Sequence, residues 1–331
     1  MIQGLAGRIG LVLGSGAARG WAHVGVIRAL EEAGLAPEIV CGSSIGAVVG
    51  ALYVAGRLDR FEQWGRELEW RELVGYFDLS FRGGLIKARK VVDFLDAQLP
   101  DQPIEAMPRP FAAVATDLAS GQEVWLRTGS LLESLRASIS IPGLLTPMRL
   151  GDRWLVDGGL VNPVPVSLCR ALGADTVVAV DLNTTLLGRR LSEVSAKSEP
   201  PPEPEPNPDP LSVPAQQGRT ESSPAPGGIR QTIQEFVADM RQRLSADDGP
   251  AEVPPSIYEV VTSSINIMQV RISRSRMAGD PPELLVTPRL GDFGLLDFDR
   301  APEAIEEGRR AVAQALAAGA PISREGRSQS S

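Results

Sequence analysis

Ser44 is the first residue whose type and surroundings could support catalysis. It lies in the segment Cys41-Gly-Ser-Ser-Ile-Gly46, which contains a G-x-S-x-G pattern. An apolar run precedes the pattern and a run with helical spacing follows it, which predicts a sharp strand-to-helix turn. Gly42 and Gly46 avoid side-chain clashes in such a turn. The backbone N–H of Ile45, at the start of the helix, could donate to an oxyanion. The alternative is a tight turn in which Ser44 only caps the helix.

A nucleophilic serine needs a group that accepts its proton, and the histidine count limits the choice. The chain has one histidine, His23, which precedes Ser44 and lies inside a predicted helix. A triad in the order serine, acid, histidine is therefore excluded. The best candidate is Asp157, which follows the apolar segment Trp154-Leu-Val and precedes two glycines. A strand end is where α/β sites gather, although Asp-Gly also caps ordinary turns.

A glycine-rich segment, Leu13-Gly-Ser-Gly-Ala-Ala-Arg-Gly20, forms a second predicted strand-to-helix turn. Turns of this composition expose consecutive N–H groups to an anion. The dinucleotide fingerprint G-x-G-x-x-G fails, because the sixth position counted from Gly14 is Arg19. The phosphate-binding pattern G-x-x-x-x-G-K-[ST] does not match either. An oxyanion hole for the nearby serine fits this segment better than a nucleotide site.

The elements that must position these residues alternate between strand-like and helix-like patterns over the first 182 residues. This order predicts parallel strands joined by right-handed crossovers. The predicted strands are Arg8–Leu13, Glu38–Cys41, Phe111–Thr116, Glu123–Leu126, Arg153–Val156 and Thr176–Asp181, and the first two helices are Gly20–Ala33 and Ser44–Ala55.

The composition changes at residue 183. Seven of the twelve residues in Glu199–Pro210 are proline and four are acidic, so we expect a disordered linker over 183–228. Apolar residues in Ile229–Leu244 fall on one face, which predicts a helix that packs on the core or lies at a lipid interface. A helix over Ser256–Ser273, a strand over Glu283–Thr287 and a helix over Ala301–Ala318 are expected to follow.

Composition narrows the class of partner. The formal net charge is −8 and the pI is about 5.0, which argues against a nucleic-acid partner. Two cysteines, with no Cys/His cluster, favour a reducing compartment and give no sign of a metal. No run is long enough to span a membrane and no signal peptide is evident. We expect a cytoplasmic protein with possible peripheral contact at the inner membrane face.

Together, the glycine-rich turn, the G-x-S-x-G turn and the downstream Asp-Gly-Gly resemble the patatin-like phospholipases. The segment Gly20–Gly34 is similar to the bacterial, neuropathy-target-esterase-like branch, as are Ala137–Gly143 and Val161–Pro165. The resemblance covers Arg8 to Asp181, and the region around 285–318 more weakly.

The resemblance implies a three-layer α/β/α sandwich with a mostly parallel central sheet. It implies hydrolysis of phospholipid, lysophospholipid or other lipid esters by a Ser–Asp dyad, without metal or cofactor. Ser44 would be the nucleophile and Asp157 the base. The N–H groups of Gly16 and Ala17 would form most of the oxyanion hole. The supporting residues would be Gly14, Ser15, Arg19, Gly20, Gly42, Gly46, Gly158 and Gly159.

The chain departs from the family's glycine run at Ser15 and Ala17, where a positive φ would cost about 1 kcal/mol. The role of Arg19 stays open between structural pairing and phosphate binding. The predicted organisation is a catalytic core over 8–182, the linker over 183–228, a segment over 229–320 that completes the core, and a disordered tail over 321–331.

There are two rival functions, and the residues disfavour the second. The departures and the long linker would also suit a catalytically weak or inactive relative with a regulatory or lipid-binding role. A malonyl-type acyltransferase also uses G-x-S-x-G, but its chemistry needs a downstream histidine, which this chain lacks. Residues 53–99 hold half of the chain's aromatic side chains, and we expect them to form either core packing or a lipid-facing wall.

Overall fold

The computed structural model describes residues 7–68, 95–99, 102–184 and 257–318. Apart from 257–260, these residues belong to one compact unit. Most of the predicted linker, the predicted helix over 229–244 and the predicted tail over 321–331 lie outside the described residues. The predicted boundaries at 182, 228 and 320 therefore stay predictions.

A single eight-stranded sheet forms the centre of the unit, with the strand order β5-β6-β3-β2-β1-β7-β8 and with β4 also paired to β3. The pairs β1–β2, β1–β7, β2–β3 and β7–β8 are parallel, while β4, β5 and β6 join by antiparallel pairing. The strands are β1 (Ile9–Leu13), β2 (Ile39–Ser43), β3 (Phe111–Asp117), β4 (Glu123–Leu126), β5 (Met148–Leu150), β6 (Arg153–Asp157), β7 (Thr176–Val180) and β8 (Leu284–Val286).

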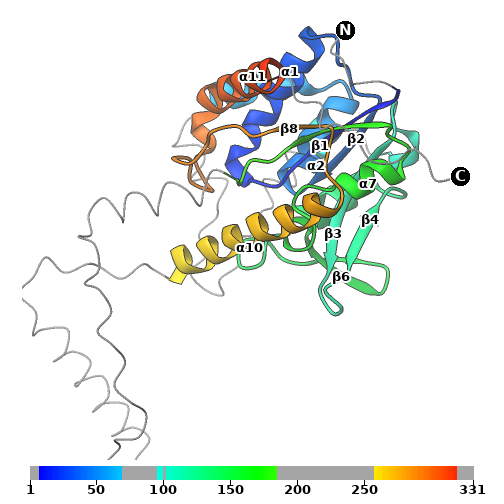
Figure 1. Cartoon of the computed structure of the whole chain (residues 1–331). Coiled ribbons are helices and arrows are strands. Elements are labelled where there is room, and N and C mark those ends of the chain that lie inside the picture. The colour runs from blue at the N-terminus through cyan, green and yellow to red at the C-terminus, as the bar shows by residue number, and fades with distance from the viewer. Residues whose placement is uncertain (1–6, 69–94, 100–101, 185–256, 319–331) are drawn as a thin grey trace, which may run out of the picture. The chain divides into compact units, whose positions relative to one another are not determined.

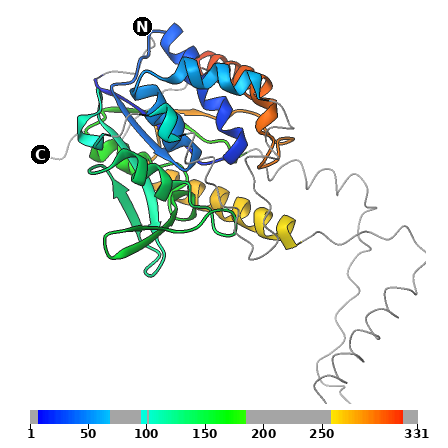
Figure 2. The ribbon, with the colours of Figure 1, turned by 180° about the vertical axis from the view of Figure 1, so that it is seen from behind.

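Helices cover both faces of this sheet, which confirms the predicted mostly parallel α/β sandwich (Figure 1). The neighbouring helices α1 and α11 lie with α2, α3 and α6 over one face, and α7 and α10 lie on the other (Figure 2). The helices are α1 (Trp21–Glu32), α2 (Ile45–Val54), α3 (Leu58–Glu67), α6 (Leu131–Ser138), α7 (Val166–Ala171), α10 (Ile257–Gly279) and α11 (Ala301–Ala317).

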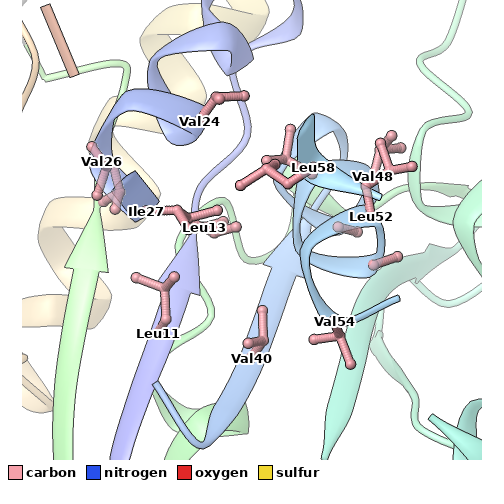
Figure 3. Packing of buried hydrophobic residues seen from close by; sticks show 14 of the residues in the cluster. Leu11, Leu13, Val24, Val26, Ile27, Val40, Val48, Leu52, Val54 and Leu58 are labelled. Atoms are coloured by element: carbon pink, nitrogen blue, oxygen red, sulfur yellow. The ribbon is translucent and has the colours of Figure 1, made fainter. Parts of the chain in front are cut away.

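The alternation of side chains along β1 explains why both faces are covered. Leu11 and Leu13 belong to the core beneath α1 and α2, whereas Val12 belongs to the core beneath α7. Figure 3 shows Leu11 and Leu13 packed with Ile27 of α1 and with buried residues of α2. Strands β1 and β2 are both apolar and buried on both faces, which fixes where the turns that follow them begin.

Strand β3 brings distant segments together. Its residues 113–116 pair with β4 along one edge, so its other edge must accept both β2 and β6. Ser43, at the end of β2, pairs with Val114, and Asp157, at the end of β6, pairs with the next residue, Ala115. The ends of β2 and β6 therefore meet head to head on one edge of β3.

The observed elements differ from the predicted ones mainly by omission. The sequence patterns did not predict β5, α3, α6 or α7, and α10 continues six residues beyond the predicted end at Ser273. In the aromatic segment, Phe61 is buried and stacks on Trp21 at 4.4 Å between ring centroids, with Trp64 beside it. This described part is core packing, and residues 69–94 lie outside the described residues.

Candidate active site

Ser44 and Asp157 are in direct contact, although 113 residues separate them in the chain. The Ser44 hydroxyl donates to Asp157 Oδ2 at 2.5 Å, and the two residues are 3% and 2% exposed. Ser44 has φ 56° and ψ −127°, and α2 begins at the next residue. A side chain at such a turn projects away from both flanking elements, which leaves its hydroxyl free for chemistry.

The backbone around Ser44 decides between the two predicted roles of this serine. The Ser44 side chain makes no capping hydrogen bond to α2, so it is not a simple N-cap. Its own N–H donates to the hydroxyl of Ser138 at 2.9 Å. Ser138, the last residue of α6, therefore binds the backbone of the turn, while the Ser44 hydroxyl binds Asp157.

Asp157 is held by hydrogen bonds at three points other than Ser44. Its Oδ1 accepts the Gly159 N–H at 2.7 Å, its carbonyl accepts the Thr116 hydroxyl at 2.8 Å, and its N–H donates to the Ser140 carbonyl at 2.9 Å. The capping role considered for Asp157 is therefore present, but it uses Oδ1 and leaves Oδ2 to Ser44.

Burial sets the basicity of this carboxylate. It raises the pKa of Asp157 to about 6, although the hydrogen bonds from Ser44 and Gly159 act in the opposite direction. At neutral pH the carboxylate is deprotonated, yet it is a stronger base than an exposed aspartate. That combination suits proton transfer from a serine hydroxyl.

The glycine-rich turn lies between β1 and α1 and presents two backbone donors. The N–H groups of Gly14 and Ser15 are used by the Val180 and Pro163 carbonyls. Within the described residues, the N–H groups of Gly16 and Ala17 make no hydrogen bond, so both are available to an anion. Ala17 has φ 51°, so the chain keeps a side chain where glycine is the easier residue.

The predicted glycines occupy places where a neighbouring segment comes too close for a side chain. A methyl group on Gly46 would collide with the Leu13 carbonyl, and one on Gly20 would collide with Ile45. One on Gly42 would meet the backbone at Ala47, and one on Gly158 would meet the Val114 carbonyl. The serine turn and the glycine-rich turn are therefore packed against each other through Gly46 and Gly20.

Arg19 supports the glycine-rich turn through hydrogen bonds in the protein interior. It is buried, and its guanidinium donates to the Gly16 carbonyl at 3.0 Å and to Asn266 Oδ1 of α10 at 3.2 Å. Burial lowers its pKa to about 10, while Asp181 and Asp297 raise it. Of the two roles left open for Arg19, these contacts favour structural pairing over phosphate binding.

His23 makes no hydrogen bond to Ser44 or Asp157. Its Nε2 lies 2.8 Å from the Gly14 carbonyl, which can only accept, so Nε2 carries the proton. Complete burial lowers the pKa of His23 to about 4. The imidazole is therefore neutral at physiological pH and supports the start of the glycine-rich turn.

Several residues at the site were not predicted. Ser138 and Ser140 lie in the segment Ala137–Gly143, which the family resemblance marked but without a role for either serine. Thr116 and the polar residues of α10 had no local signal, because only tertiary pairing brings them to the dyad. In the described part of the chain, no group of His, Cys, Asp and Glu could hold a metal ion.

The fold and this pair of residues define an α/β protein with a serine at a strand-to-helix elbow beside a buried carboxylate. The patatin-like phospholipase family model matches residues 11–170. An NTE family protein of Mycobacterium tuberculosis (strain ATCC 25618 / H37Rv) is 36% identical over 94% of this chain and 92% of its own length. The chain therefore belongs to the NTE family of proteins with a patatin-like phospholipase domain.

Two further matches are shorter or more distant. Patatin-like phospholipase domain-containing protein 6 of Homo sapiens is 34% identical over 184 residues, which are 53% of this chain and 13% of that protein. The crystal structure of VipD from Legionella pneumophila has a TM-score of 0.53 and 13% identity, covering 96% of this chain and 68% of that one. At this identity the similarity supports the fold alone.

Proposed function

We propose that the protein is a serine acyl-hydrolase that cleaves lipid carboxyl esters, of phospholipids or lysophospholipids among others, through a Ser44–Asp157 dyad. The observation that carries the proposal is the buried 2.5 Å hydrogen bond from the Ser44 hydroxyl to a carboxylate whose pKa is raised to about 6. The two free N–H groups at Gly16 and Ala17 support it, since they lie on the turn packed against the serine turn.

In the proposed acylation step, Ser44 Oγ attacks the ester carbonyl carbon while its proton passes to Asp157. The N–H groups of Gly16 and Ala17, with that of Ile45, are the proposed donors to the tetrahedral oxyanion. Asp157 then gives the proton to the leaving alcohol as the ester C–O bond breaks. The product of this step is an acyl-enzyme on Ser44.

Deacylation repeats the sequence with water. A water molecule attacks the acyl carbonyl and passes a proton to Asp157, and the fatty acid leaves as Ser44 Oγ takes that proton back. One carboxylate thus acts as base and then as acid in both halves of the reaction. Asp157 can do this only if its pKa lies near the working pH.

The test is hydrolysis of p-nitrophenyl butyrate and of a lysophospholipid by the wild type, Ser44→Ala and Asp157→Asn. We expect both variants to lose at least about 1000-fold in kcat while remaining folded. Ser43→Ala is the matched control, because its buried hydroxyl has no partner among the described residues. A wild type without turnover, or a Ser44→Ala variant that matches it, would instead favour the inactive, lipid-binding alternative.

We also propose that the protein meets its substrate as a peripheral protein on an anionic lipid surface. Leu118 and Trp154 are 55% and 52% exposed, and the register of β3, β4 and β6 places Trp125 and Trp154 on one face. Arg149 is the cross-strand neighbour of Trp154 and could pair with lipid phosphates. Trp154→Ala should weaken co-sedimentation with phosphatidylglycerol vesicles without changing p-nitrophenyl butyrate hydrolysis.

We propose that this lipid surface is the cytoplasmic face of the membrane. Both cysteines, Cys41 and Cys169, are buried as free thiols, as a reducing compartment would allow. Within the described residues, no helix combines the length and apolar character needed to cross a bilayer. Fractionation of cells that express the protein would test the location.

A further inference from the structure

Helix α10 turns polar side chains toward the core. Asn266, Gln269, Ser273 and Arg276 recur at intervals of three and four residues, which places them on one face. Gln269 and Ser273 on this face are buried, whereas the apolar residues Val261, Ile267 and Met268 are exposed. A surface helix normally buries its apolar face. This helix lies outside residues 11–170, the part matched by the family model.

The buried polar face of α10 contacts the glycine-rich turn at two places. Asn266 Oδ1 accepts from Arg19, which also holds the Gly16 carbonyl. One turn further along, Gln269 Oε1 accepts from Asn183 Nδ2 at 3.1 Å. Asn183 is fully buried, and the same amide group reaches the Ser15 carbonyl at 3.1 Å.

The other end of the Gln269 amide faces the proposed base. A methyl group placed on Gly159 would stand 2.5 Å from Gln269 Nε2, 2.9 Å from Asp157 Oδ1 and 3.0 Å from Ser15 Cβ. These three groups therefore converge on one small space beside the dyad. Gln269 Nε2 and Asp157 Oδ1 lie within reach of a single bridging water.

We propose that Gln269 is a positioning residue for the dyad, an inference that rests on the proposed function. Its oxygen accepts from Asn183, and its Nε2 lies beside Gly159, near Asp157 Oδ1 and not the Oδ2 that Ser44 binds. A neutral donor there favours the charged carboxylate and orients it without adding charge. Through Asn183, the same side chain is linked to the Ser15 carbonyl of the glycine-rich turn, so this donor beside the base keeps its position relative to that turn.

Other charges around Gln269 must stay constant in the test. They are the charged or titratable groups that contact α10, Asn183 or the glycine-rich turn, or act on Arg19, and each is paired or buried. They are Arg19 in the glycine-rich turn, Asp181 after β7, Asp297 before α11, Glu123 of β4 with Arg276 of α10, and the neutral His23 of α1.

The experiment compares Gln269→Glu with Met268→Glu, its neighbour on the exposed face of α10. Both add one carboxylate to the same helix, but only the first places it beside Asp157. We expect Gln269→Glu to lower kcat by about tenfold at pH 5 and by about twofold at pH 7, with KM nearly unchanged. The acid limb of its pH–rate profile should move up by about one pH unit. Met268→Glu should match the wild type in both.

Gln269→Met, of similar size and uncharged, serves if Gln269→Glu does not fold. It should also lower kcat and move the acid limb upward, because Asp157 then loses a donor. Profiles of the Gln269 variants that coincide with the wild type, or a rise in KM with kcat unchanged, would overturn the inference. Loss of the Ser44 dependence of turnover would instead refute the proposed function, so the two failures are distinguishable.

Discussion

The β1–α1 turn and the β2–α2 turn are built alike but present different groups. Each follows one of two adjacent parallel strands and contains glycines where the backbones touch. Each also holds one non-glycine residue at positive φ: Ala17 at 51° and Ser44 at 56°, the only two among the described residues. At Ser44 the side-chain hydroxyl is the proposed nucleophile. At Ala17 the backbone N–H is a proposed hydrogen-bond donor to the oxyanion.

At Ser44 the proposed chemistry requires the side chain that strains the backbone. At Ala17 it does not. A hydroxyl at position 44 requires a side chain, so glycine cannot replace Ser44 without removing the proposed nucleophile. At position 17 the methyl group supplies no atom to the proposed chemistry. We therefore expect the first turn to tolerate substitution toward glycine, and the second to tolerate none.

Outside the Ser44–Asp157 pair itself, the largest effect should come from the contact between the two turns. A methyl group in Gly46→Ala would collide with the backbone at Leu13, so one turn must move relative to the other. We expect kcat/KM to fall by about 100-fold or more. Gly50→Ala in the same helix is the control, since its methyl group would meet the Val40 side chain at 3.0 Å instead of a backbone. Equal activity in the two variants would show that the turns are not mutually positioned.

The next effect concerns pH and the β2–α2 turn. Because Ser44 needs the ionised form of Asp157, kcat/KM should fall tenfold per pH unit below an apparent pKa of about 6. A pH–rate profile measures this directly. An acid limb near pH 4, the range of an ordinary exposed carboxyl group, would contradict the assignment of Asp157 as a buried base.

The β1–α1 turn should respond to pH through stability instead. His23 has a folded pKa of about 4 and an ordinary pKa of 6.5, so the unfolded chain binds more protons between these values. The stability it contributes is present above pH 6.5 and is lost as pH falls toward 4, by about 3 kcal/mol. Urea unfolding at pH 7 and pH 4 should show a smaller loss in His23→Gln than in the wild type. An equal loss in both would contradict this origin.

The smallest effect is expected at Ala17. Ala17→Gly removes a left-handed side chain but gives the unfolded chain more freedom, and the net stabilisation should be at most about 1 kcal/mol. Esterase activity should stay within about twofold, because the N–H is kept. Thermal unfolding of the variant measures the first quantity. A destabilised variant would mean that the Ala17 methyl group contributes packing that outweighs its strain.

Local signals account for what could be predicted from the sequence. The turn at Ser44 is coded by its own glycines and the apolar runs beside it. Asp157 was found because histidine is missing after Ser44 and because an apolar strand precedes the Asp-Gly-Gly segment. The β-strand and helix patterns along the first 182 residues likewise gave the α/β class.

The unpredicted features depend on contacts between distant segments. Nothing beside Ser138 in the sequence indicates that its hydroxyl accepts the Ser44 N–H, 94 residues away. Gln269 is unremarkable within α10 until Asn183 and Gly159 are placed beside it. Alternation alone also cannot tell that β6 runs antiparallel to β3, because period-two patterning is the same in both directions.

The shared edge of β3 has a consequence for how this family can change length. Ser43 and Asp157 pair with adjacent residues of one strand, Val114 and Ala115, and this pairing sets the distance between them. Insertions or deletions in the connections between Ser44 and β3, or between β4 and β6, leave that spacing intact. A single residue inserted within β3 between Val114 and Ala115 would instead part the two ends by about 3.4 Å. Natural length variation should therefore be tolerated in the connections and excluded from β3.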